Sequence, residues 1–169
     1  MYTLGRGTFF QKRGDMRRQS LKAGKSVYLV KAVLSDLYGR VKGKPFRVLA
    51  VPEDYTLYGL AKAIIESFDF GFDHPFGFYD EINRWIDSKE GYELFADMGE
   101  ESEFRGVKKT KVNSVFNQIG KKMLFLFDYG DEWHFVVELK GIELLKEGER
   151  YPFIVDSFGE ARPQYSEEE

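Results

Sequence analysis

The two histidines of the chain, each close to carboxylates, are its best candidates for acid–base or metal chemistry. His74 directly follows Asp73, and His134 follows Asp128 and Asp131 within one short segment. A carboxylate that orients an imidazole raises its basicity and fixes its tautomer, which suits a general base. No residue is assigned a catalytic role, but we expect any binding role to depend on a small set of residues: Asp73, His74, Asp128, Tyr129, Asp131 and His134.

A divalent cation is the second chemistry that these residues allow. If the two segments fold side by side, Asp73, His74, Asp131 and His134 form a mixed nitrogen and oxygen site, and a metal-dependent hydrolase becomes an alternative function. The competing interpretation is structural. Asp128 and Gly130 have the chemistry of a tight turn, and Asp73 and His74 precede Pro75, where a helix stops. The sequence leaves any metal unknown and predicts no cofactor.

Other chemistries have weaker support in the sequence. The chain contains no cysteine, which excludes disulfides, thiolate zinc sites and cysteine nucleophiles. Glycines near residues 5–7 and 39–43 lack the spacing of a phosphate loop. Asp80, Glu81, Asp87 and residues 100–103 supply carboxylates of the glycosidase type, but the sequence does not fix their separation. Phe76, Phe78, Tyr79 and Trp85 suit either base stacking or core packing, and the sixteen phenylalanines favour the core.

Length and composition predict one soluble, cytoplasmic domain. A chain of 169 residues, 43% hydrophobic and 17% aromatic, is too rich in apolar side chains to be disordered. No apolar run approaches the roughly 18 residues of a membrane span, and the N-terminus lacks the apolar block of a secretion signal. We therefore expect no membrane association.

Charge is distributed unevenly along the chain. Residues 1–25 contain seven Lys or Arg and one Asp, a net charge of +6, and since the whole chain carries −3 the remainder carries −9. A basic arm of this kind either binds phosphates weakly, through Arg13, Arg17, Arg18 and Lys22, or is a solvated terminus. We divide the chain into a basic N-terminal arm (1–25), one domain (26–162) and an acidic tail (163–169).

Periodicity predicts the elements that must position the candidate residues. Strands are expected over residues 27–35 and 45–51, joined by a turn-rich segment. A helix with one apolar face is expected over residues 56–67, and a shorter helix capped by Thr110 over 112–119. Further strands are expected over residues 76–82, 123–127, 133–139 and 151–155. The result is an α+β fold: a mixed, mostly antiparallel sheet with a β-hairpin near the C-terminus and one main amphipathic helix packed on it.

The hairpin around residues 128–131 places its side chains on two faces. Alternation puts Trp133, Phe135 and Val137 on one face and His134 on the other. A contact between His134 and Asp128 or Asp131 is therefore not guaranteed by the sequence. We expect Trp133 to be buried.

The Asp-Tyr-Gly-Asp-x-Trp motif at residues 128–133 also carries a family resemblance. It is accompanied by residues 45–52, the helix over residues 56–67 and the aromatic segment with Asp73 and His74 over residues 70–78. In this order the stretches resemble the Ri-plasmid ORF-three-like family, which is found in plasmid and insertion-element reading frames. The resemblance implies an α+β fold and no established activity. Members commonly carry a cysteine-bearing, acidic stretch near the end, and this chain departs from that pattern at residues 157–163.

A binding or interaction module without established catalytic activity is the leading interpretation, with a protein or a second copy of the chain as its partner. The first alternative is a mobile-element-associated accessory protein that binds nucleic acid through the basic arm. The second is the metal-dependent hydrolase.

Overall fold

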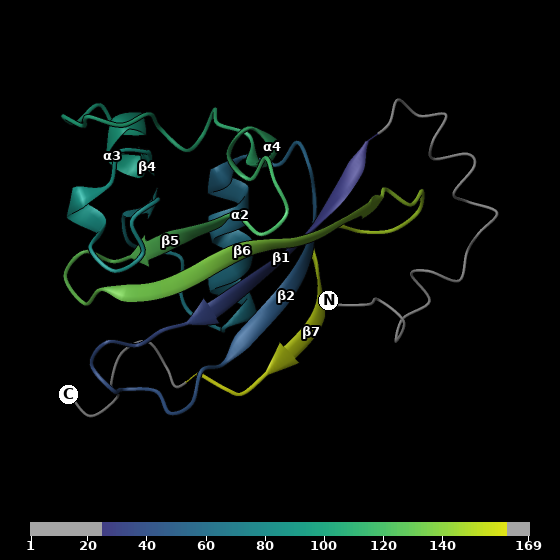
Figure 1. Cartoon of the computed structure of the whole chain (residues 1–169), viewed down its shortest axis with the longest axis horizontal. Helices are drawn as coiled ribbons and strands as arrows, with labels where there is room; N and C mark the ends of the chain where they lie inside the picture. Colours follow the sequence, from purple (N-terminus) through teal and green to yellow (C-terminus); the bar gives the residue numbers. More distant parts are fainter. Residues whose placement is uncertain (1–24, 162–169) are drawn as a thin grey trace.

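Seven antiparallel strands form a single sheet in the computed structural model, which describes residues 25–161 (Figure 1). Their order across the sheet is β4-β3-β5-β6-β1-β2-β7. The strands are β1 (Ser26–Leu34), β2 (Phe46–Pro52), β3 (Phe76–Tyr79), β4 (Gly91–Glu93), β5 (Lys122–Phe127), β6 (Trp133–Leu144) and β7 (Phe153–Phe158). The helices are α2 (Leu57–Ser67), α3 (Leu94–Asp97) and α4 (Val112–Val115), with a 3-10 turn η2 (Trp85–Asp87). The α+β prediction is confirmed.

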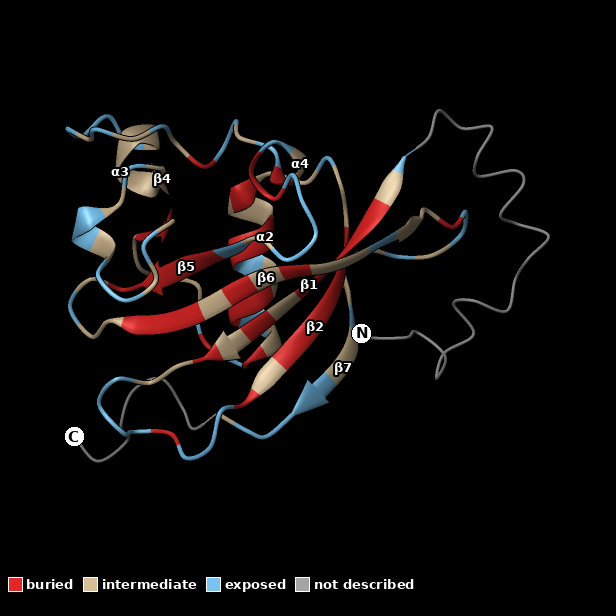
Figure 2. Cartoon of the chain, in the orientation of Figure 1, coloured by how far each residue is buried: buried red, intermediate tan, exposed pale blue. Residues whose placement is uncertain are grey.

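Helix α2 covers one face of the sheet and closes the main core. Thr56 begins the helix, because its hydroxyl accepts a hydrogen bond from the Gly59 amide at 3.0 Å. The apolar face predicted from periodicity is buried, and it packs on side chains of β1, β5 and β6. Each large buried side chain stabilises the fold by about 1.5–3 kcal/mol. Figure 2 shows the buried residues concentrated in α2 and the central strands.

The opposite face of the sheet carries two smaller apolar clusters. Near β3 and β5, Tyr79, Leu124 and Leu126 are buried beneath loop residues that include Trp85 and Phe104. Near β1 and β2, four buried residues pack against the segment that leads into β7: Val27, Leu29, Val48 and Ala50. Loops, rather than a second helix layer, therefore cover this face.

The predicted hairpin forms, and its alternation is as expected. Phe127 pairs with Trp133 and Leu126 with His134 across β5 and β6. Trp133 is 2% exposed and lies in the main core, while His134 lies on the other face. Strand β6 continues beyond the predicted end to Leu144, because β1 pairs along its whole length.

Two elements are shorter than predicted. Helix α4 spans only one turn, since Ile119 is exposed and Gly120 has a φ of 96°, so no buried face continues the helix. Thr110 does not cap it; its hydroxyl instead donates to the Gly106 carbonyl at 2.7 Å. Strand β3 ends at Tyr79 rather than residue 82, because Asp80 turns the chain by accepting the amides of Lys89 and Glu90.

The predicted basic arm, except Lys25, and the predicted acidic tail lie outside the described residues. Arg13, Arg17, Arg18 and Lys22 are therefore not placed. Within residues 25–161, no helix is long and apolar enough to cross a membrane.

Replacing Leu60 of α2 by alanine tests the helix-to-sheet core. Leu60 is fully buried, so Leu60→Ala should lower the free energy of unfolding by about 2–5 kcal/mol in urea denaturation. Lys62→Ala is the control, because Lys62 is exposed and lies 3.9 Å from Glu66, an ion pair worth less than about 0.5 kcal/mol. Equal losses for the two variants would contradict this view of the core.

Candidate functional site

The two candidate segments meet because β3 and β5 are neighbours in the sheet. Phe76 pairs with Phe127, so the residues before β3 lie beside the turn after β5. The amide of Asp128 donates to the Pro75 carbonyl at 2.9 Å. This register brings Asp73 and His74 to the predicted hairpin turn.

His74 lies between two carboxylates. Its Nδ1 is 2.7 Å from Asp73 Oδ1, and its Nε2 is 3.6 Å from Asp128 Oδ2. The imidazole also packs edge-on against Phe127, with ring centroids 6.0 Å apart. Each ring nitrogen therefore faces a carboxylate oxygen, and the ring forms part of a small apolar pocket of about 240 Å³ lined by Tyr58, Phe72, Phe76, Leu94 and Met98.

Asp128 fixes the turn with one oxygen and faces His74 with the other. Its Oδ1 accepts the amides of Gly130 at 3.0 Å and Asp131 at 3.2 Å. Its φ of 71° lies in the left-handed region, which aspartate tolerates better than most residues. Asp128 therefore both stabilises the turn, as the structural interpretation predicts, and contacts His74 in the candidate site.

His134 belongs to a different environment. Its Nε2 lies 3.1 Å from Glu132 Oε1, and its side chain is 8% exposed. Because His134 pairs with Leu126 on the face opposite Phe127, the sheet separates it from His74. The backbone carbonyl of Asp131 is bound by Arg40. The four residues predicted to hold a metal are thus not brought together, and no group of three His, Asp or Glu side chains in residues 25–161 could hold one.

Tyr129 leads to a second polar group that the sequence did not indicate. Its hydroxyl lies 2.7 Å from that of Tyr79, which donates to Glu93 Oε2 at 2.5 Å. Ser102 donates to the other Glu93 oxygen at 2.6 Å. Because the Tyr79 proton is directed to Glu93, Tyr79 is left to accept from Tyr129. The chain of donors therefore ends on the Glu93 carboxylate.

Both tyrosines hold their protons tightly. Burial is the main cause that raises the pKa of Tyr79 far above its usual value, and the neighbouring Tyr129 and Glu93 raise it further. Burial also raises the pKa of Tyr129, and the Glu93 charge adds to the effect. These hydroxyls act as fixed hydrogen-bond donors rather than as bases.

Glu93 and Ser102 form part of the wall of an open hollow of about 700 Å³, which we call the Glu93 hollow. It is lined by Trp85, Ile86, Ser88, Glu93, Glu100, Glu101, Ser102, Glu103 and Phe104. The Trp85 ring packs on Tyr79 and Tyr129, with centroids 5.0 and 5.7 Å apart. Phe104 packs on Tyr79 at 5.9 Å. Of the aromatics noted in the sequence, Phe76 and Phe78 are core, whereas Trp85 faces the hollow.

No sequence pattern indicates that Tyr79, Glu93 and Ser102 act together. They come from β3, the three-residue β4 and an irregular loop, and none of these segments has a long periodic pattern. The exposed carboxylates of residues 100–103 were visible in the sequence, but their position over Trp85 depends on the fold.

Arg40, from the loop between β1 and β2, holds the 128–132 turn from outside. It donates to the carbonyls of Asp131 at 3.1 Å and Glu132 at 3.3 Å, and its guanidinium lies 3.5 Å over the Trp133 ring. Asp36 orients Arg40 through a 3.0 Å bond to Nε. Burial opposes ionisation of Asp36, but hydrogen bonds from the Val41 amide, Arg40 and the Tyr38 amide lower its pKa.

Gly77 allows the two tyrosine hydroxyls to approach each other. A Cβ at this position would lie 2.7 Å from both the Tyr79 and the Tyr129 oxygens. Gly77→Ala should therefore displace the pair and cost about 1–3 kcal/mol of unfolding free energy, measured by denaturation. Gly141→Ala is the control, since its Cβ would meet Leu29 at an ordinary 3.5 Å. If both variants retain native stability, the tyrosine pair is not tightly packed.

The Asp36 carboxylate should make stability depend on pH through the Arg40 contact. Because the folded pKa lies below the unfolded value, its contribution is complete above about pH 5 and is lost as the pH falls through the folded pKa. At pH 7, Asp36→Asn should cost about 1–3 kcal/mol in urea denaturation, and the charge-dependent part should vanish in acid. Asp87→Asn, from the exposed Arg84 pair, should cost less than about 0.5 kcal/mol. A loss for Asp36→Asn that is unchanged in acid would contradict the assignment.

Comparison with known proteins places the chain in a family. The family described as plasmid pRiA4b ORF-3-like protein matches residues 30–166. A similar solved structure is that of a protein of unknown function, MM3350, from Methanosarcina mazei Go1, with 27% identity and a TM-score of 0.67; the match covers 85% of this chain and 75% of that one. No match was found among curated proteins. The match over most of the chain confirms the resemblance seen in the motif at residues 128–133: the protein belongs to the plasmid pRiA4b ORF-3-like family.

Proposed function

We propose that this domain is a binding module and that its partner inserts a cationic group, such as an arginine or lysine side chain, into the Glu93 hollow. The observation that carries the proposal is the Glu93 carboxylate, which is fixed by Tyr79 and Ser102 at the wall of an aromatic hollow. The volume of about 700 Å³ falls within the range of sites that take small ligands or large side chains.

Charge favours a cationic partner. Within the described part of the chain, the residues lining the hollow include four glutamates and no lysine or arginine. The faces of Trp85 and Phe104 add a second attraction, because an ammonium or guanidinium group binds over an aromatic ring. An anionic ligand would be repelled by these glutamates.

Binding is better supported than catalysis. A general base must release or accept a proton near neutral pH, but the pKa values of Tyr79 and Tyr129 are raised well above that range. The pair supplies directed hydrogen bonds that hold Glu93 in place. A fixed carboxylate loses little conformational freedom when a partner binds, which favours affinity.

The Asp73–His74 pocket is the second part of the proposed binding surface. Tyr129 contacts Phe95 of α3 at 4.9 Å between ring centroids, and the next residue towards the N-terminus, Leu94, lines the His74 pocket. The half-exposed Met98 at the rim is a flexible apolar side chain of the kind that adapts to partners. An apolar residue next to the cationic one in a peptide would fit this pocket.

Titration of the isotope-labelled protein with short arginine peptides tests the proposal. Peptides that differ only in arginine or its neutral isostere citrulline isolate the contribution of charge. The arginine peptide should shift the indole signal of Trp85 saturably and leave that of the buried Trp133 unchanged. Glu93→Gln should weaken binding about tenfold or more, because a charge-assisted hydrogen bond is lost.

Glu81→Gln is the matched control, because Glu81 is exposed and does not line the hollow. It changes the net charge by the same amount as Glu93→Gln. Equal binding of the arginine and citrulline peptides, or equal weakening by the two substitutions, would rule out a specific cation site at Glu93.

A further inference from the structure

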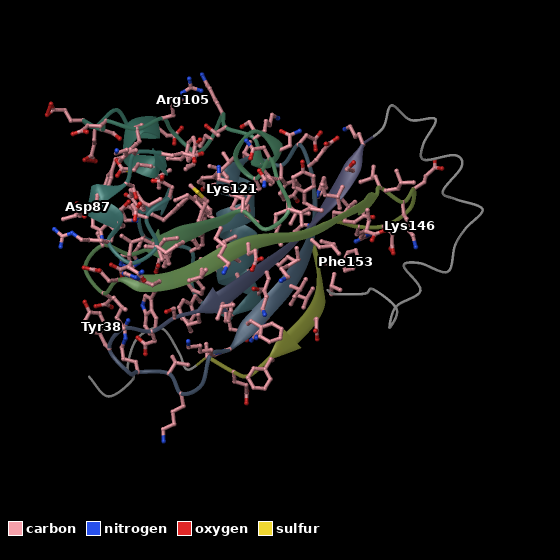
Figure 3. The ribbon with its side chains drawn as sticks, in the orientation of Figure 1. Tyr38, Asp87, Arg105, Lys121, Lys146 and Phe153 are labelled. Carbon is pink, nitrogen blue, oxygen red and sulfur yellow. The ribbon has the colours of Figure 1, made fainter. Side chains whose placement is uncertain are left out.

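The segment between α3 and α4 carries a second charged surface, of the opposite sign. Four exposed cations occur within residues 105–111: Arg105, Lys108, Lys109 and Lys111. In the part of the chain that the structure describes, none of them forms a salt bridge, whereas Lys25, Arg84 and Lys121 each pair with a carboxylate. Figure 3 shows Arg105 pointing away from the body of the protein. We call residues 105–111 the basic loop.

Three backbone hydrogen bonds hold the basic loop in place. The amides of Leu57 and Tyr58 donate to the carbonyls of Thr110 and Val107, at 2.9 and 3.2 Å. The amide of Glu93 donates to the Arg105 carbonyl at 2.8 Å. A loop anchored to α2 and β4 presents its cations at fixed positions, which lowers the entropic cost of binding.

The carboxylate of Asp97 binds the backbone of the basic loop. Asp97 accepts the amides of Val107 at 2.7 Å and Lys108 at 3.2 Å. Gly106 is required for this approach, because a Cβ there would collide with the Asp97 carboxylate. The negative charge of Asp97 is thus directed to the backbone. Lys109 and Lys111 are exposed, and the exposed Lys108 has its Nζ 5.1 Å from the centroid of the Tyr58 ring.

The basic loop adjoins the point where the N-terminal segment joins the described body. Lys25 pairs with Asp54 at 3.0 Å. The hydrogen bond from Lys25, and to a smaller degree the charge of Lys111, lower the pKa of Asp54 despite its partial burial. Lys25 and Lys111 therefore flank the same carboxylate. The sequence before Lys25 contains six more Lys or Arg.

We propose that the basic loop binds the backbone phosphates of double-stranded nucleic acid. Regularly spaced phosphates suit several exposed cations on one loop, and release of condensed counterions drives such binding without reading sequence. The loop itself contains no aromatic side chain that could stack on an unpaired base, which favours a duplex over a single strand. This inference goes beyond the proposed function, because the Glu93 hollow would repel the same partner.

Fluorescence anisotropy of a labelled DNA duplex with the full chain tests the inference, at salt concentrations between about 50 and 200 mM. In the test variant Arg105, Lys108, Lys109 and Lys111 are replaced by glutamine. In the control variant the exposed Lys42, Lys44, Lys89 and Lys122 are replaced instead, so both variants lose four positive charges. The test variant should reduce the log–log salt slope by about 3 to 4, and the control by less than about 1.

Thermal midpoints of both variants, compared with the native chain, show that the fold is intact. Equal slopes for the two variants, or a failure of the native chain to bind at low salt, would overturn the inference. Competition by polyglutamate at the same charge concentration as DNA would also overturn it, since an acidic protein would then be an equally good partner. Retention of arginine-peptide binding by the test variant is expected, and its loss would mean that the basic loop acts through the Glu93 hollow.

Discussion

The pairing of β3 with β5 is the constraint on which the rest of this site depends. β3 follows the loop that carries His74, and β5 leads into the turn that carries Asp128 and Tyr129. Once Phe76 pairs with Phe127, the alternation of the two strands fixes what lies on each face. Phe76 and Phe127 enter the main core below α2, while Tyr79 and Leu124 face the other side. A shift of one residue would exchange these faces.

The turn at residues 128–132 joins the two parts of the site. Asp128 faces His74, whereas Tyr129 contacts Tyr79 and Trp85 beside the Glu93 hollow. Adjacent residues of the turn therefore contribute to the two parts of the site. Arg40 and Asp36 hold this turn from a loop that is distant in sequence. Trp133 lies beneath Arg40, and its indole nitrogen is buried with no acceptor among the described residues. The cation over its ring offsets part of the cost of that unpaired donor.

The sequence predicted the helices and strands in which an apolar pattern repeats over many residues, but it did not predict the shorter ones. Helix α2 and the β5–β6 hairpin were predicted closely because eleven helical residues and an alternating strand pattern each repeat a local rule. β4 has only three residues, and η2 and α3 are a single turn each, so no period is visible in residues 80–105. Glu93 lies in that stretch, which is why the hollow was not predicted.

The sequence indicated which residue types form the candidate site, but it did not indicate which of these residues lie close together. Both histidines were correctly placed beside carboxylates, yet His74 contacts Asp73 and Asp128 while His134 contacts Glu132. The alternation that puts Trp133 inward already puts His134 on the other face. A metal site shared by both histidines would have required them on one face, and only the β3–β5 register shows that His74 lies on the side of Phe127.

The two proposed surfaces carry opposite charges and would therefore bind different partners. Glu100, Glu101 and Glu103 line the hollow, and the basic loop begins two residues after Glu103. Arg105 and Lys109 line a separate recess together with Asp97. A duplex held at the loop would be repelled by the hollow, and a basic peptide held in the hollow would be repelled by the loop. The two partners would therefore occupy the domain without competing. A basic peptide in the hollow would neutralise the neighbouring glutamates and so raise the affinity of the loop for nucleic acid.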